Sequence, residues 1–232
     1  MPTTKFLFPP LMAALLAAAP ALRADDSRKA AERLQDSADL FNEVMGAPDK
    51  SIPQDLLNKA SCVVLVPGLK KGGLIIAAKY GKGYAVCRAP SQGWGPPAAI
   101  RIEGGSAGLQ AGYSSSDVVL LIMNERGMKH LMQSKFTIGA DATAAIGPVG
   151  RDATAQTDAM MRAEILSWSR SHGLFAGVSL DGATLRGDVD ENEALYGKRW
   201  TTKEIVNSGA TPPAAAKPLI DTLTRYSMRK AQ

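Results

Sequence analysis

The chain has 232 residues, of which 45% are hydrophobic and 21% are charged. This balance is typical of a globular protein and excludes both a disordered chain and one that crosses a membrane many times. The net charge of +5 is too small to predict nucleic-acid binding. Two histidines and two cysteines are too few for a structural zinc cluster. We therefore expect neither a metal site nor a cofactor.

The N-terminus resembles a secretory signal peptide over residues 1–24. Lys5 provides the positive end, an uncharged stretch covers 6–19, and small residues lead to Ala24. The apolar stretch is shorter than the roughly 20 residues of a membrane span, although a retained anchor is the alternative. We expect cleavage after Ala24 and export, so that the mature chain is periplasmic or secreted, or peripheral to a membrane.

Export would place Cys62 and Cys87 in an oxidising compartment, where a disulfide can form. Both cysteines lie in apolar, strand-like segments. Pairing cannot be deduced from sequence, so a disulfide and two buried free thiols both stay open.

Residues 26–46 predict an amphipathic helix. Leu34, Ala38 and Phe41 recur at helical spacing on one face, and Gly46 ends the pattern. A second short helix is expected over 53–60.

Short apolar segments rich in β-branched residues follow, and glycine, proline or serine separates nearly all of them. The segments are 62–68, 73–81, 83–89, 98–105 and 117–123. Between two of them, residues 80–83 (YGKG) predict a hairpin loop. Strands at this spacing, without helices between them, predict an antiparallel sheet that is curved or barrel-like.

The remainder of the chain mixes helical and strand-like patterns. Residues 125–133 predict a helix, 157–170 either a helix or a strand pair, and 173–187 further strands. Residues 211–216 read as a Pro/Ala linker, and the apolar residues of 219–226 predict a last helix. The expected fold class is α+β, with the sheet flanked by N- and C-terminal helices.

One motif suggests catalysis. Residues 104–108 match G-x-S-x-G around Ser106, and Asp141 and His172 follow in the order of a hydrolase triad. That motif requires a strand-to-helix turn, whereas the sequence after it reads as strand and turn. We expect no catalytic residues here, and a serine hydrolase stays a remote alternative.

Basic residues gather in two places. Arg28, Lys29 and Arg33 lie on the first predicted helix, and Lys70 and Lys71 lie in a predicted turn, PGLKKGG. They form either an ordinary solvated surface or a contact for anionic lipid head groups.

The apolar face of the first helix also has two interpretations. Leu34 and Phe41 could lie in a membrane interface, or they could cover the sheet as core residues. The acidic residues on the polar face of this helix make core packing at least as favourable.

Four longer segments together resemble the SYLF domain family. They are KYGKGYAV (79–86), WGPPAAIRIEGGSAGLQAGYSSSDVVLLIM (94–123), GADATAAIGPVGR (139–151) and SWSRSHGLFAGVSLDGATLRGDVDENEALYG (167–197). They occur in the order found in the family and cover most of residues 27–208. The organisation expected is a signal peptide over 1–24, a SYLF-like domain over 25–210, and a linker with a short helix over 211–232.

The resemblance implies a lipid-binding domain and not an enzyme. Eukaryotic relatives bind phosphoinositides and fungal relatives also bind actin, in part through an N-terminal amphipathic segment and basic residues. Here that segment corresponds to 26–46, and the basic residues include Lys70 and Lys71. An exported chain would meet neither cytoplasmic actin nor phosphoinositides, so we expect anionic lipid or a membrane surface as its partner. An envelope protein is the alternative partner, with lipid binding then incidental.

Overall fold

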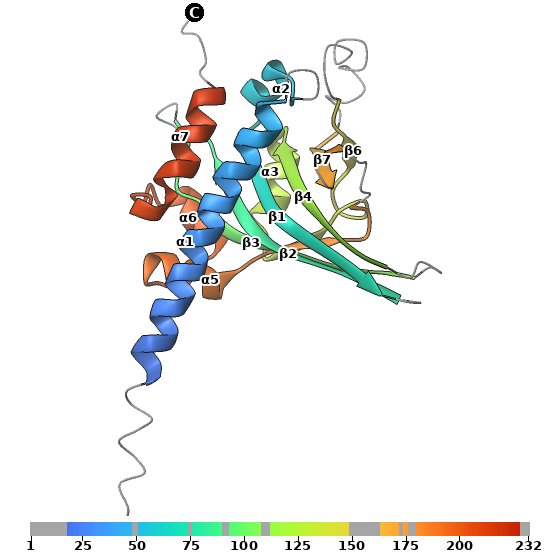
Figure 1. Ribbon diagram of the computed structural model, residues 1–232. Helices are drawn as coiled ribbons and strands as arrows, with labels where there is room; N and C mark the ends of the chain where they lie inside the picture. The colour runs from blue at the N-terminus through green and yellow to red at the C-terminus, as the bar shows by residue number, and fades with distance from the viewer. Residues whose placement is uncertain are drawn as a thin grey trace, which may run out of the picture.

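The computed structural model describes residues 18–47, 51–73, 76–89, 93–107, 112–148, 163–171, 174–175 and 180–227. The fold is a curled sheet with helices packed against both of its faces (Figure 1), which confirms the expected α+β class. The strands are β1 (Cys62–Gly73), β2 (Ile76–Cys87), β3 (Ala98–Ala107), β4 (Gly112–Ile122), β5 (Lys135–Thr137), β6 (Ala144–Ile146), β7 (Ile165–Ser171), β8 (Leu174–Phe175) and β9 (Thr184–Gly187).

The helices are α1 (Ala18–Met45), α2 (Gln54–Lys59), α3 (Glu125–Leu131), α5 (Val189–Tyr196), α6 (Thr202–Asn207) and α7 (Lys217–Tyr226), with a 3-10 turn η2 at Ala214–Ala216. Among the described residues, no helix is both long enough and apolar enough to cross a bilayer. Helix α1 starts before the expected residue 26, while α2 and α3 confirm the two short helices predicted from the sequence.

The sheet order is β5-β9-β3-β2-β1-β4-β7-β6, and β8 pairs with β7. The long central pairs are antiparallel, whereas β6 and β7 run parallel. Strand β7 settles the alternatives for 165–170 in favour of a strand, while 157–162 lie outside the described residues.

Two hydrophobic clusters lie on the two faces of the sheet. On one side, Val63 and Leu65 of β1 pack with α1 and α7. On the other side, inside the curl, Cys62, Val64 and Val66 share a cluster with Leu131 of α3. Because both faces are covered, the strands read as continuous apolar segments and not as an alternating pattern.

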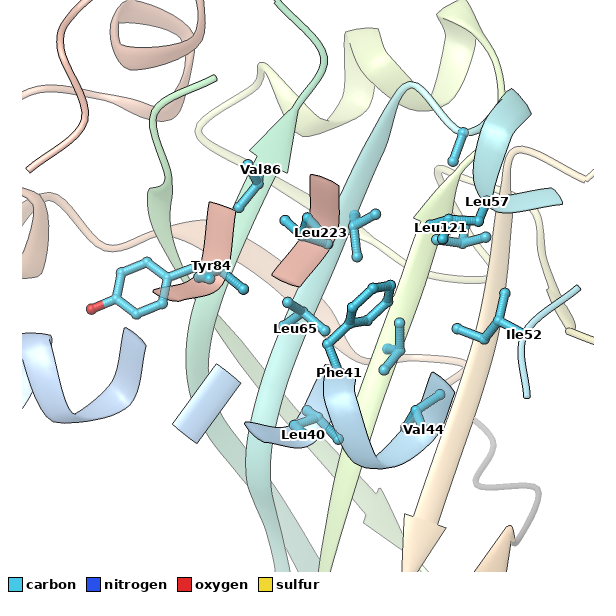
Figure 2. Packing of buried hydrophobic residues seen from close by; sticks show 14 of the residues in the cluster. Leu40, Phe41, Val44, Ile52, Leu57, Leu65, Tyr84, Val86, Leu121 and Leu223 are labelled. Atoms are coloured by element: carbon cyan, nitrogen blue, oxygen red, sulfur yellow. The ribbon is translucent and has the colours of Figure 1, made fainter. Parts of the chain in front are cut away.

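Helix α1 buries the face that its periodicity predicted. Figure 2 shows Phe41 among Leu65, Leu121 and Leu223, which come from β1, β4 and α7. The Phe41 ring meets the Tyr226 ring edge-on at 6.0 Å between centroids. Helix α7 confirms the last helix predicted over 219–226, and it packs into the same cluster as α1. Ala216, at the end of the expected Pro/Ala linker, is buried in this cluster as well.

The hairpin loop predicted at 80–83 is wrong, because β2 continues through it. A Cβ atom on Gly83 would lie 1.8 Å from the Leu65 carbonyl oxygen, and one on Gly81 would lie 2.8 Å from Val66 and Leu69 side-chain carbons. These glycines therefore allow a close approach between strands instead of a reversal.

The turn predicted at PGLKKGG is also wrong, since all of these residues belong to β1. The register with β2 shifts between Leu65 and Lys70, which marks a β-bulge. Gly68 lies in the bulge with φ 64°, a left-handed conformation that favours glycine. The proline and glycine thus mark a bend inside a strand and not its end.

Cys62 and Cys87 are paired across β1 and β2 and are joined by a disulfide. The bridge closes a loop with a sequence separation of 25 residues. In the loop-entropy model, a bridge of this span stabilises the folded chain by about 3 kcal/mol.

We expect the paired change Cys62→Ala and Cys87→Ala to lower the free energy of unfolding by about 3 kcal/mol. Urea denaturation of the variant and of the oxidised parent chain measures this loss. Added reductant should destabilise the parent alone, and an equal effect on the cysteine-free variant would contradict the assignment.

Candidate functional site

A cluster of charged side chains lies between α1, β2 and α5, with its carboxylates buried and its cations about a quarter exposed. Arg33 pairs with Glu191, and Lys82 Nζ lies 2.7 Å from Asp188 Oδ2 and 3.3 Å from Glu191 Oε2. The Tyr84 hydroxyl donates to Glu191 Oε1 at 2.6 Å. Glu191 is therefore bonded by three side chains, one from α1 and two from β2, although its own side chain is only 5% exposed.

The local sequence places the two carboxylates. Asp188 is the N-cap of α5, and its side chain accepts from the Glu191 backbone N–H. One turn further into the helix, Asn192 accepts from the Ala99 N–H at 2.7 Å and donates to the Trp200 carbonyl at 2.8 Å. Helix α5 is therefore fixed to β3, with its first turn directed at Lys82 and Arg33.

Burial and charge act in opposite directions on these groups. Burial alone would raise the pKa of Asp188, but the hydrogen bond and charge of Lys82 outweigh it and lower this pKa below its usual range. The pKa of Tyr84 is raised strongly, by burial first and then by the charge of Glu191. The cluster therefore holds two cations, two carboxylates and a neutral phenol.

A small cavity of about 150 Å³ adjoins the cluster. Arg33, Lys82 and Glu191 line it together with Asp26, Lys29, Asp190 and Ala194. The charges of the cluster compensate one another, so we assign it the role of fastening α1 to the sheet. The Ser27 hydroxyl, which donates to the Ala194 carbonyl at 2.8 Å, adds a second tie between α1 and α5.

The three basic residues predicted on the first helix each have a carboxylate partner. Arg28 and Lys29 both pair with Asp25 on the helix surface, and Arg33 pairs with Glu191. The pairs with Asp25 are solvent-exposed, so Arg28 and Lys29 stay accessible to a ligand. Arg33 is instead engaged in the buried cluster.

Leu34 and Phe41 are both 0% exposed beneath α1. Of the two interpretations left open by the sequence, the structure shows core packing for both residues. Contact with lipid through these side chains would require α1 to leave the sheet, and that would also break the cluster around Glu191.

Lys70 and Lys71 lie beyond the β-bulge, on a projecting part of the sheet that we call the arm. The arm consists of Lys70–Gly73, Ile76–Tyr80, Glu103–Ala107 and Gly112–Ser115. Figure 1 shows the long strands extending past the helices here. Adjacent in one strand, the two lysines point to opposite faces of the arm.

Within the part of the chain that the structure describes, neither Lys70 nor Lys71 has an ion-pair partner. Figure 1 places the N-terminal half of α1 and the end of the arm at separate corners of the molecule. The two basic groups predicted from the sequence are therefore not brought together, and only those of the arm are uncompensated.

The G-x-S-x-G segment does not form a nucleophile elbow. Ser106 lies within β3, opposite Ala77 of β2, instead of at a strand-to-helix turn. Asp141 accepts from the Thr137 N–H at 2.7 Å in a turn after β5, and His172 is outside the described residues. A cleft of about 360 Å³ near Asp141 is lined by Glu103, Gly104, Lys135, Phe136, Thr137, Thr184 and Arg186.

The sequence did not predict the charged cluster, although several of its residues belong to segments that carry the family resemblance. Lys82 and Tyr84 belong to KYGKGYAV, while Asp188, Glu191 and Asn192 belong to GDVDENEALYG. The signal for α5 was an Asp followed three residues later by Glu, with Gly197 at the end. Nothing in the pattern indicated that the two segments meet.

The chain is similar to several characterised proteins. Residues 103–226 match the family described as Ysc84: Las17-binding protein actin regulator. The chain is 29% identical over 203 residues to SH3 domain-containing YSC84-like protein 1 of Homo sapiens, covering 87% of this chain and 58% of that protein. It is 32% identical over 185 residues to LAS seventeen-binding protein 3 of Saccharomyces cerevisiae, covering 78% and 40% respectively.

The chain thus spans about three fifths, or less, of the length of the curated relatives that it matches. The family match begins within β3 and ends with α7, so it includes α5 and the C-terminal helix but not α1. The alignments with the two relatives cover most of the chain. The protein belongs to the SYLF (Ysc84) domain family.

Proposed function

We propose that this protein is a non-enzymatic lipid-binding protein of the cell envelope, which contacts anionic head groups through basic residues of its arm. The description of the family and the names of its relatives are those of binding and regulatory proteins. Among the properties that the family resemblance implies, lipid binding agrees best with the exposed basic residues of the arm. The signal-peptide pattern of residues 1–24 and the Cys62–Cys87 bridge support export to an oxidising compartment.

The observation that carries the proposal is the uncompensated charge of Lys70 and Lys71. The segments that form the arm contain one acidic residue, Glu103. Its carboxylate pairs with Arg101 at 2.7 Å and with Arg186 at 3.4 Å. A basic residue near an anionic membrane surface contributes about 1 kcal/mol to binding. Two such residues at a projecting end can approach a surface before the rest of the molecule does.

We expect residues 25–232 to float with vesicles that contain anionic phospholipid, and to bind less as salt rises. The change Lys70→Glu with Lys71→Glu should weaken this binding by at least tenfold, because it turns two attractive charges into repulsive ones. Flotation at low and at physiological salt measures the difference.

The matched control is Lys59→Glu with Lys203→Glu, which changes the net charge equally at exposed positions of α2 and α6. This pair should bind at least several-fold more tightly than the arm variant. Equal binding by both variants would show that net charge alone governs association, and would contradict a specific head-group contact.

A protein-interaction module of the envelope is the second candidate. The family description and the yeast relative both name a protein that is bound, Las17. A stable protein partner recovered with the mature chain, together with no vesicle binding under any condition, would favour this second function.

A further inference from the structure

Exposed aromatic side chains gather on the arm. Among the described residues, the large hydrophobic side chains that remain exposed are Tyr113 at 70%, Ile146 at 58% and Tyr80 at 46%. Both tyrosines lie on strands that flank β1, whereas Ile146 lies on β6 at the edge of the sheet. Two of these three side chains are thus concentrated in one small part of the fold.

The strand register places both tyrosines on the same face as Lys70. Tyr80 is opposite Lys70, and Lys70 is in turn opposite Ser115 on β4. Tyr113 lies two residues before Ser115, so its side chain shares that face, where it lies opposite Gly72. A Cβ atom on Gly72 would be 3.5 Å from Tyr113 Cδ2, so the ring lies beside the bare backbone of β1.

This face, which we call the tyrosine–lysine face, therefore consists of Tyr80, Lys70 and Tyr113 around small residues. Gly72, Ala78 and Ser115 fill the space between the larger side chains. Ala78 and Ser115 are exposed, and the helix layer does not reach this end of the sheet (Figure 1). Among the described residues, this surface is thus open, with small side chains in its middle and a basic group at Lys70.

The charges bordering this face favour an anionic partner. Glu103 lies opposite Tyr80 and pairs with two arginines, and Asp117 pairs with Arg170 at 3.2 Å. The connecting segments 74–75 and 108–111 contain no acidic residue in their sequence. Lys70 therefore stands as an uncompensated cation between two tyrosines.

We propose that the tyrosine–lysine face is the membrane-docking surface of this protein, and that both tyrosine rings enter the head-group region of an anionic bilayer. Tyrosine suits this region because its ring is apolar while its hydroxyl stays hydrated. Lys70 contacts an anionic head group between the rings. This inference rests on the proposed lipid binding and assigns it to residues that the basic clusters alone did not indicate.

Docking through this face leaves α1 in place. The apolar residues of α1 are buried, and its Arg33 is held by Glu191, so inserting α1 would break both sets of contacts. The arm offers exposed aromatic rings without any such rearrangement. The geometry thus favours the arm over the amphipathic helix as the element that meets the lipid.

The test combines flotation with a fluorescence probe. Tyr80→Ser with Tyr113→Ser should weaken binding to phosphatidylglycerol-containing vesicles by about tenfold or more, because two partly buried rings are removed from the interface. Tyr113→Trp places a fluorescent aromatic ring at the same position of this face. Its added fluorescence should shift to the blue on binding and be quenched by brominated lipid.

Ile146→Ser and Ile146→Trp are the matched controls, since Ile146 is similarly exposed on a distant strand. They should bind like the parent, and Trp at 146 should show neither shift nor quenching. Thermal unfolding of all variants checks that the fold is kept. The native tryptophans contribute the same background to both probe variants.

Different results would contradict the docking face alone or lipid binding as a whole. If the parent chain binds vesicles but the double serine variant binds equally well, and Trp at 113 is not quenched, the tyrosine–lysine face is not the docking surface while lipid binding stands. If the parent chain binds no vesicle of any composition, lipid binding and this inference both fail.

Discussion

Glu191→Ala is expected to lower the free energy of unfolding by about 3 kcal/mol, among the largest effects of any side-chain truncation in this protein. The change leaves Arg33 and Lys82 without their shared carboxylate and removes the nearer of the two acceptors of the Tyr84 hydroxyl, the other being the Ala30 carbonyl at 2.9 Å. Breaking a buried ion pair from one side costs about 3–5 kcal/mol. The lower end applies because Arg33 and Lys82 are each about a quarter exposed to solvent.

Glu193→Ala is the matched control on the same helix. Glu193 pairs with Arg199, whose side chain is 62% exposed, and such pairs contribute at most about 1 kcal/mol. Urea denaturation of the two variants measures the difference. If both variants unfolded at the same urea concentration, the cluster around Glu191 would not be what fastens α1 to the sheet.

Gly83→Ala is expected to be more damaging still, with a loss above about 4 kcal/mol or failure to fold. The added methyl group would lie 1.8 Å from the Leu65 oxygen and 2.8 Å from the Leu65 carbonyl carbon. Both of these atoms belong to the backbone of β1, so no rotation of a side chain can relieve the overlap. The strands would have to separate just before the bulge.

Gly105→Ala gives the comparison, because no atom lies within 4 Å of the methyl group that it adds. We expect this variant to stay within about 0.5 kcal/mol of the parent chain. Circular dichroism of the soluble protein shows whether each variant folds, and the urea midpoint measures its stability. A Gly83→Ala chain as stable as Gly105→Ala would contradict the close packing of β1 on β2.

The sequence predicted the central strands well, because their segments are apolar on both faces and rich in β-branched residues. The first helix was predicted equally well from the spacing of Leu34, Ala38 and Phe41. Periodicity identifies an apolar face but not what covers it. Only the fold shows that this face packs on β1 and β4.

The two wrong turns have a common physical origin. Gly81, Gly83 and Gly68 are residues that a local reading associates with chain reversal. In the fold, one is needed for a bulge with positive φ and the others for a close approach of two strands. Both requirements arise from the neighbouring strand, so they cannot be read from the segment alone.

The candidate sites likewise combine features that a single segment shows with features that depend on contacts between distant segments. Lys70 and Lys71 could be singled out from the sequence, because adjacent lysines are visible in any reading. Their lack of carboxylate partners depends on long-range pairing, as does the meeting of Lys82 with Asp188. The shared face of Tyr80 and Tyr113 likewise depends on the register across β1.

The packing of α7 against α1 has a consequence for the order in which the chain folds. Asn42 and Thr222, whose side chains are hydrogen-bonded at 3.4 Å, are separated by 180 residues. Contacts of such long range form slowly, because the chain must close a large loop before they can stabilise it. The hairpins of the sheet can assemble early, whereas the helix layer cannot close until the last residues are available. A chain still in synthesis therefore keeps exposed the apolar surface that α7 covers in the finished fold.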